Sequence, residues 1–247
     1  MKTYLPPICL IGFILLLWEV TARVVDKLFL LPSPQGIVVK LWELKSYLIV
    51  NHLPVTLIVI LLGLGISVVL GVGLAVAMNR STLLERTFYP ILITSQTIPI
   101  IALAPIFVLW FGYSIWSKVV VTTLITFFPI TVSTFDGLRS SNRELKELML
   151  TMGATKRDLF FKLDIPSALP QFFSGLKVAV PLSVIGAAIG EWLGAQAGLG
   201  YFSRRMMTQF DGAGVFAPIV LLSLLGIGLF LLIVWLESKV LYWRKYN

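Results

Sequence analysis

Residues 53–78, LPVTLIVILLGLGISVVLGVGLAVAM, form a stretch of the chain without a single charged side chain. A helix needs about 20 mainly apolar residues to cross the hydrocarbon core of a bilayer, and this stretch is longer than that. Backbone groups find no water in that core, so the stretch predicts a transmembrane α-helix. Three more uncharged stretches follow along the chain: 87–117, 119–135 and 215–236.

Two weaker apolar stretches carry charges. Residues 5–25 contain Glu19 and Arg23, which are spaced so that they pair on one helix face. Residues 172–193 contain Lys177 and Glu191 near their ends, where a long cation can reach the headgroups and an acid can reach water. We therefore expect an all-α membrane protein with about six transmembrane helices in a single domain, residues 1–247. The expected helices are 5–25, 53–78, 88–111, 117–135, 172–193 and 215–239.

The composition excludes a cytosolic enzyme. Of 247 residues, 57% are hydrophobic and 13% charged, and the mean hydropathy is +0.92. Soluble domains carry about 25% charged residues. The net charge of +8 indicates membrane-flanking cations rather than nucleic-acid binding on so apolar a chain. A single cysteine, Cys9, allows no internal disulfide, and the single His52 cannot build a metal site alone.

The placement of the cations predicts the orientation. With the N-terminus inside, thirteen Lys and Arg residues lie on the cytoplasmic side, six lie outside and Arg23 lies within the first helix. This asymmetry favours two cytoplasmic termini. A cleaved signal peptide is the alternative for the first helix, but the apolar run is long and Glu-Val-Thr-Ala-Arg is a poor cleavage site, so we favour an uncleaved helix.

The first outer segment, residues 33–51, predicts a short amphipathic helix. The rigid sequence Leu31-Pro32-Ser33-Pro34 precedes it, and Ser33 is a plausible N-cap. Apolar residues then recur at near-helical spacing, which is typical of a helix lying in the membrane interface. Two interpretations remain open, a docking surface and a membrane-surface strut.

The third span is interrupted by prolines. Gln96 and Thr97 precede Pro99, and Pro105 follows, so we expect a kinked helix. Polar side chains beside a broken helix often build transport sites, which makes Gln96, Thr97 and Pro99 candidates for a translocation path. A purely architectural kink is the alternative. Glu191 is a further candidate for that path, although we favour its pairing with Arg204 or Arg205 in the next loop.

The cytoplasmic loop 136–171 is the one sizeable polar segment. Residues 142–149 predict a short helix that Gly153 ends, and Thr155 predicts the cap of a second helix together with Asp158. Pro166 and Pro170 are expected to end this second helix. It offers both basic and apolar side chains, and we interpret it as a peg for a partner. These side chains are Lys156, Arg157, Lys162, Leu159, Phe160 and Phe161.

This loop resembles the Glu-Ala-Ala loop of ABC-importer permeases, whose pattern is E-A-A-x3-G-x9-I-x-L-P. The Glu, Gly and Pro are in register, whereas Leu148 and Met149 replace the two alanines. Further motifs are similar to the nitrate/sulfonate/taurine-type branch. The loop motif reads Glu147-Leu148-Met149-x3-Gly153-x9-Leu163-Asp164-Ile165-Pro166. The motifs similar to the branch are Trp18-Glu19-x3-Arg23, Leu31-Pro32-Ser33-Pro34, Pro105-x4-Trp110-Phe111-Gly112, Phe128-Pro129 and Gly198-Leu199-Gly200-Tyr201.

The resemblance implies a permease of the bacterial cytoplasmic membrane, contacting lipid and working as a homodimer. It also implies two ATPase subunits that bind ATP and Mg, so that this chain holds no cofactor, and an extracellular binding protein. Residues 155–161 would form the coupling helix. Residues 191–202 resemble the corresponding stretch of permeases for thiamine pyrimidine precursors more than that of other members of the branch. The implied coupling residues are Glu147, Gly153, Ala154, Thr155, Lys156, Arg157, Leu159, Phe160 and Pro166.

The sequence argues against other function classes. No G-x4-G-K-[ST] pattern occurs, so the chain itself is not expected to hydrolyse ATP. A secondary transporter would need intramembrane coupling carboxylates and an inverted repeat, and neither is evident. A membrane-embedded enzyme would need paired acids or a histidine at membrane depth. A non-enzymatic permease without a metal site is therefore our prediction, with these two classes as alternatives.

Overall fold

The computed structural model describes residues 5–25 and 29–243. Lys2, Lys27, Arg244 and Lys245, which entered the orientation argument, lie outside the described residues, as do both chain ends. Every regular element in the described part is a helix, which confirms the all-α membrane protein. The helices are α1 (Leu5–Val25), α2 (Pro34–Tyr47), α3 (Leu53–Arg80), α4 (Thr82–Ser95), α5 (Ile100–Phe111), α6 (Ile115–Arg139), α7 (Arg143–Thr151), α8 (Lys156–Leu159), α9 (Ile165–Gly194), α10 (Leu199–Thr208) and α11 (Gly212–Val240).

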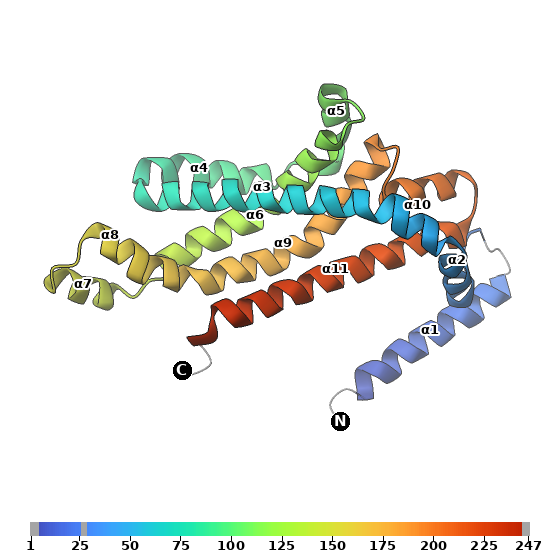
Figure 1. Cartoon of the computed structure of the whole chain (residues 1–247), viewed down its shortest axis with the longest axis horizontal. Helices are drawn as coiled ribbons and strands as arrows, with labels where there is room; N and C mark the ends of the chain where they lie inside the picture. Colours follow the sequence, from blue (N-terminus) through green and yellow to red (C-terminus); the bar gives the residue numbers. More distant parts are fainter. Residues whose placement is uncertain (1–4, 26–28, 244–247) are drawn as a thin grey trace.

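The long helices form an elongated bundle with small helices at its two ends. α7 and α8 lie at one end, and α2 and α10 lie at the other (Figure 1). Four helical stretches are long and apolar enough to cross a membrane: Pro34–Arg80, Ile115–Arg139, Lys156–Gly194 and Gly212–Val240. The bent pair α4–α5 adds a fifth if it counts as one span. The six predicted spans also included α1, which forms at the predicted place but is not among these stretches.

The predicted helix 88–111 is not continuous, because the chain breaks between α4 and α5. The two helices are bent by 100° relative to one another. Pro99 lacks a backbone N–H and stands at the N-cap of α5, so the ladder of α4 cannot continue through it. The second predicted kink does not interrupt the chain, since Pro105 lies inside α5.

α6 is the centre of the bundle, and it packs most extensively against α9 and then against α3. Small residues bring these helices together. A Cβ atom at Gly175 of α9 would lie 2.7 Å from the carbonyl oxygen of Pro129, and one at Gly186 would lie 3.0 Å from the Cα of Thr122. Ser67 of α3 adds a buried hydrogen bond to the carbonyl oxygen of Thr123 at 2.9 Å. Close backbone packing thus fixes the relative positions of α3, α6 and α9.

α11 joins this core through an ion pair inside the bundle. Lys177 Nζ of α9 lies 2.8 Å from Glu237 Oε2 of α11, and both side chains are largely buried. We expected Lys177 to extend to the headgroups, but it lies within reach of a carboxylate on the neighbouring helix instead. Pairing removes the cost of leaving an isolated charge in a poorly solvated position.

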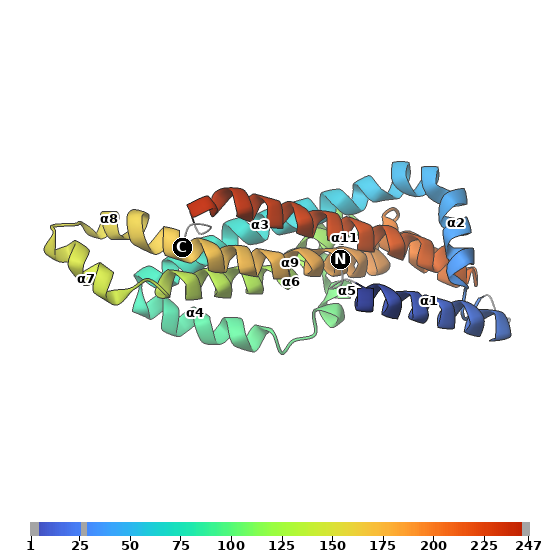
Figure 2. The same ribbon diagram turned by 90° about the horizontal axis from the view of Figure 1, so that it is seen from below.

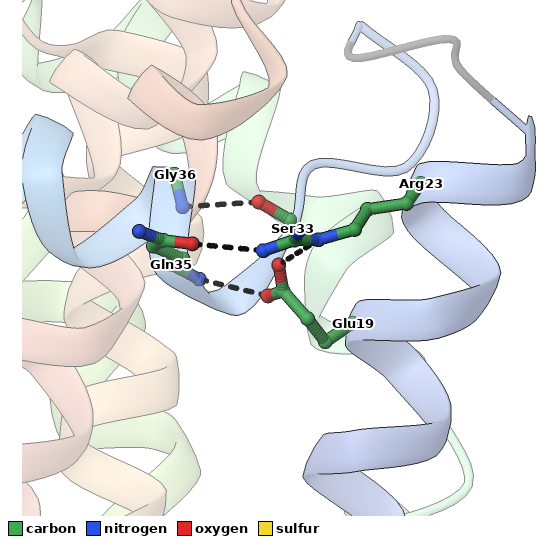
Figure 3. Close-up of polar contacts among 5 residues, drawn as sticks. All are labelled: Glu19, Arg23, Ser33, Gln35 and Gly36. Carbon is green, nitrogen blue, oxygen red and sulfur yellow. Dashed lines mark hydrogen bonds and ion pairs between the residues drawn. The ribbon is translucent and has the colours of Figure 1, made fainter.

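α1 is attached to the rest of the protein near its C-terminal end. Arg23 Nε pairs with Glu19 Oε1 at 2.8 Å, as the spacing predicts. Glu19 Oε2 also accepts from the backbone N–H of Gln35 at 3.2 Å, while Ser33 Oγ accepts from Gly36 N (Figure 3). Ser33 is therefore the N-cap of α2 as predicted, and the Glu19 carboxylate is a second acceptor at the same helix N-terminus.

Two π-helical segments connect peripheral helices to long spans without a break. Leu48–His52 joins α2 to α3, and Phe160–Asp164 joins α8 to α9. Each segment is followed by a proline in the first turn of the next helix, Pro54 or Pro166. Figure 2 shows α2 crossing the end of the bundle opposite α7 and α8, transverse to the long helices. The predicted short helix forms and is continuous with the first core span, while its place on the outer side of the membrane stays a prediction.

Candidate functional site

The candidate coupling residues lie in and beside two short helices at one end of the bundle (Figure 1). α7 begins at Asn142, whose side chain accepts from the backbone N–H groups of Glu144 and Leu145. Glu147 is exposed on this helix and pairs with Arg143 at 3.0 Å. Among the residues that the structure describes, the polar partner of this first motif residue is thus Arg143 of the same helix.

Gly153 ends α7 as predicted. Its φ of +86° lies in the left-handed region that glycine adopts without a steric penalty. Ala154 N donates to Met149 O at 2.9 Å, and Gly153 N donates to Leu150 O at 3.0 Å. These two bonds form a Schellman motif, which satisfies carbonyl groups at the helix end and reverses the chain.

Thr155 starts the second short helix, also as predicted. Its hydroxyl accepts from Asp158 N at 3.2 Å, and the Asp158 carboxylate accepts from Thr155 N at 3.1 Å. This is a reciprocal capping box. Asp158 also pairs with Lys162 at 2.7 Å. Lys156 and Arg157 remain exposed cations on this helix.

The predicted end of the second helix is wrong. Neither Pro166 nor Pro170 stops it, and the helical stretch runs from Lys156 to Gly194. Pro166 falls in the first turn of α9, where the missing N–H costs least, and the π-helical segment before it absorbs the change in bonding. The candidate coupling helix is thus the tip of a membrane-spanning helix.

The apolar side chains of this end divide into two groups. Leu159 is buried, and Phe160 is half-buried with the Arg80 guanidinium 4.6 Å from its ring centroid. These two side chains therefore pack against this chain itself, and their predicted part in coupling stays a prediction. A second group is exposed, and its largest exposed fraction is the 79% of Met152. We call these residues the apolar tip: Leu145, Leu148, Leu150, Met152 and Phe161.

Sequence reasoning missed Asp164. It is buried where the second short helix meets α9, and Lys146 of α7 approaches it to 3.8 Å. This contact connects α7 electrostatically to the π-helical segment that precedes α9. The available signal was an acid between Leu163 and Ile165 in an otherwise apolar part of the motif.

The candidates for the translocation path do not come together in this structure. Gln96, Thr97 and Pro99 are exposed at the break between α4 and α5. Glu191 is fully buried near the C-terminal end of α9. Its predicted ion pair with Arg204 or Arg205 is wrong, because Glu191 Oε2 instead accepts from the backbone N–H of Gly200 at 2.7 Å and no ion pair involves it among the described residues.

An open apolar groove lies between α9 and α11. Its volume is about 660 Å³, and Ile185, Trp192 and Phe230 are among the side chains that line it. No group of three or more His, Cys, Asp or Glu side chains is placed to hold a metal ion in residues 5–25 and 29–243.

Comparison with known proteins complements this geometry. Residues 67–242 match the family described as binding-protein-dependent transport system inner membrane component. The chain is 60% identical over 241 residues to the formylaminopyrimidine transport permease protein ThiX of Halalkalibacterium halodurans, covering 98% of this chain and 96% of the relative. It is 34% identical over 217 residues to the riboflavin transport system permease protein RibX of Chloroflexus aurantiacus, covering 87% and 81%.

A more distant relative comes from the predicted branch. The putative aliphatic sulfonates transport permease protein SsuC of Bacillus subtilis is 29% identical over 236 residues, covering 94% of this chain and 85% of the relative. Permeases named for taurine and nitrate also match. The similarity covers α1 as well as the membrane core, since the alignment with ThiX spans nearly the whole chain.

Proposed function

Because the chain belongs to the family of inner membrane components of binding-protein-dependent transport systems, we propose that it imports formylaminopyrimidine as the permease of an ATP-driven importer. The family and its relatives are named as transport components, which supports a permease role and not an enzymatic one. The substrate rests on one observation, the 60% identity to ThiX over almost the full length of both chains. The second relative is named for riboflavin, another nitrogen heterocycle, whereas the sulfonate permease is less similar at 29%.

The partner at the cytoplasmic end is an ATPase subunit that binds ATP and Mg. The apolar tip supports this proposal, because exposed Leu, Met and Phe side chains at the end of a polar loop favour burial against another protein. Lys156 and Arg157 lie beside the tip and offer charges to an acidic rim. Since α8 continues into α9, movement of the tip reaches the membrane core without passing through a flexible loop.

The remaining partners are a second copy of the permease, an extracellular binding protein and membrane lipid. The apolar groove between α9 and α11 supports burial against another apolar surface. Both termini are proposed to be cytoplasmic. In Figure 1, α11 runs toward the end of the bundle that carries α7 and α8, and α1 runs away from it.

Transport in proteoliposomes tests the function. The chain would be co-expressed with the ATPase and the binding protein encoded beside it and reconstituted, and uptake of radiolabelled formylaminopyrimidine, taurine and nitrate would be measured. We expect uptake of formylaminopyrimidine alone, requiring both ATP and the binding protein. Uptake of taurine or nitrate instead would reject the substrate. Uptake that needs no ATPase would reject the importer and favour a secondary transporter.

A further inference from the structure

The N-terminus of α10 is held by side chains from two other helices. Three consecutive backbone N–H groups, of Gly198, Leu199 and Gly200, point at three different side chains. Gly198 N donates to His52 Nδ1 at 3.0 Å, and Leu199 N donates to Thr56 Oγ1 at 2.9 Å. Gly200 N donates to Glu191 Oε2 at 2.7 Å. The orphan donors that begin a helix are thus satisfied from α9 and from the start of α3.

The burial of these acceptors makes the contacts specific. His52 is 3% exposed, and Thr56 and Glu191 are 0% exposed. A buried acceptor that loses its donor keeps the full cost of desolvation, so the three bonds are difficult to break singly. The carboxylate also requires glycine opposite it. Gly198 has a φ of +119°, and a Cβ there would overlap the Glu191 carboxyl group.

The same helix that carries Glu191 carries the cytoplasmic tip. The helical stretch from Lys156 to Gly194 has 39 residues. Glu191 therefore lies roughly 50 Å from Lys156 along the helix, at 1.5 Å per residue. Thr56 of α3 and His52 of the preceding π-helical segment are the other two acceptors, and α3 packs against α6, which in turn packs along α9. Displacement of the tip thus has a continuous mechanical route to α10.

We propose that Glu191, Thr56 and His52 form a latch that makes α10 move as one body with the outer ends of α9 and α3. Glu191 is then a positioning residue, which transmits movement of the cytoplasmic tip to the outer mouth. This inference rests on the proposed ATP-driven transport and assigns one of its mechanical parts. α10 exposes Arg205, Met207 and Thr208 at the end of the bundle opposite α7 and α8.

The coupling ratio tests the latch. Uptake of formylaminopyrimidine per ATP hydrolysed would be measured for the complete complex in proteoliposomes. We expect Glu191→Ala and Thr56→Val to lower this ratio roughly 10-fold, the factor that corresponds to losing a hydrogen bond to a buried partner. Glu191→Gln should retain most of the ratio, because its amide oxygen still accepts from Gly200 N.

Ser203→Ala is the matched control. Ser203 is buried on the same helix, but its hydroxyl donates to the carbonyl oxygen of Val215, outside the latch. We expect the control to keep the wild-type ratio. An equal fall in Ser203→Ala would show that any buried bond of α10 has this effect and would overturn the latch. An unchanged ratio in both Glu191→Ala and Thr56→Val would overturn it as well.

Spin labels report the movement directly, whichever solute is transported. Exposed Asn51 and Arg205 would be replaced by Cys in a Cys9→Ser background, and the distance between labels measured with and without ATP in the complex. With Glu191 present, we expect a single distance between the labels that is the same with and without ATP. In Glu191→Ala we expect a broader distribution of distances, or a distance that depends on ATP. A nucleotide-dependent distance in the wild type would overturn the latch. If formylaminopyrimidine is not taken up but the distance between the labels is still unchanged by ATP, the proposed substrate is rejected and the latch is not.

Discussion

Single residues set the geometry of the surface at the end of the bundle that carries α7 and α8. Gly153 reverses the chain through a left-handed φ of +86°, and Thr155 starts the next helix only two residues later. Because both short helices are defined by caps, the positions of Leu148, Met152 and Phe161 on the apolar tip follow from two local motifs. The caps therefore control which side chains are exposed at this end of the protein.

Substitution of Gly153 tests this control. We expect Gly153→Ala to strain the turn by about 1–2 kcal/mol, the cost of a left-handed backbone for a residue with a Cβ. Gly153→Val should be worse and Gly153→Asn milder, because asparagine tolerates this conformation. Co-purification of the ATPase with the permease should fall in that order. Gly73→Ala is the control, since a Cβ there meets nothing within 4 Å; equal co-purification in all variants would contradict the prediction.

Helix pairs carry the stability of the membrane core. α3, α6 and α9 approach closely through small residues, whereas α11 relies on apolar contacts and on the ion pair between Lys177 and Glu237. Removing one member of a buried pair leaves the other charge without compensation. The ion pair thus stabilises the attachment of α11 to α9 only while both residues are present.

A double-mutant cycle measures this attachment. We expect Lys177→Met and Glu237→Gln each to destabilise the protein by roughly 2 kcal/mol, less than for a fully buried pair because both side chains keep some solvent contact. The double variant should recover part of that loss. Thermal unfolding in detergent micelles is the measurement, with the exposed Lys239→Met as control. Strictly additive losses would show that the two residues do not interact.

The arrangement of the complete bundle gives it two chemically different ends. The apolar tip, with Lys156 and Arg157, lies at one end, and α10, with Arg205, lies at the other. Between them, α6 and α9 run side by side along most of the bundle (Figure 1). A protein with this shape can place an ATPase and a binding protein on opposite sides of the membrane.

Labelling of single cysteines tests this orientation. Arg157→Cys and Arg205→Cys would be made separately in a Cys9→Ser background and exposed to a membrane-impermeant maleimide in oriented vesicles. We expect Arg157→Cys to react only from the cytoplasmic side and Arg205→Cys only from the outside, because the intervening helix is long enough to cross the bilayer. Reaction of both from the same side would reject the proposed topology.

Local chemistry made much of this protein predictable from its sequence. Uncharged stretches predicted the core spans because an unpaired charge is costly in hydrocarbon. Ser33, Gly153 and Thr155 predicted helix ends because their partners lie within five residues along the chain. The spacing of Glu19 and Arg23 predicted their ion pair for the same reason.

Only the tertiary structure decided the features that depend on distant residues. Glu191 accepts from Gly200 rather than pairing with Arg204 or Arg205, because α10 folds its N-terminus onto the carboxylate. Pro166 failed to end a helix because the preceding π-helical segment accommodates it. Local sequence specifies how a segment bonds to itself, but the partner of a buried polar group depends on which helices pack around it.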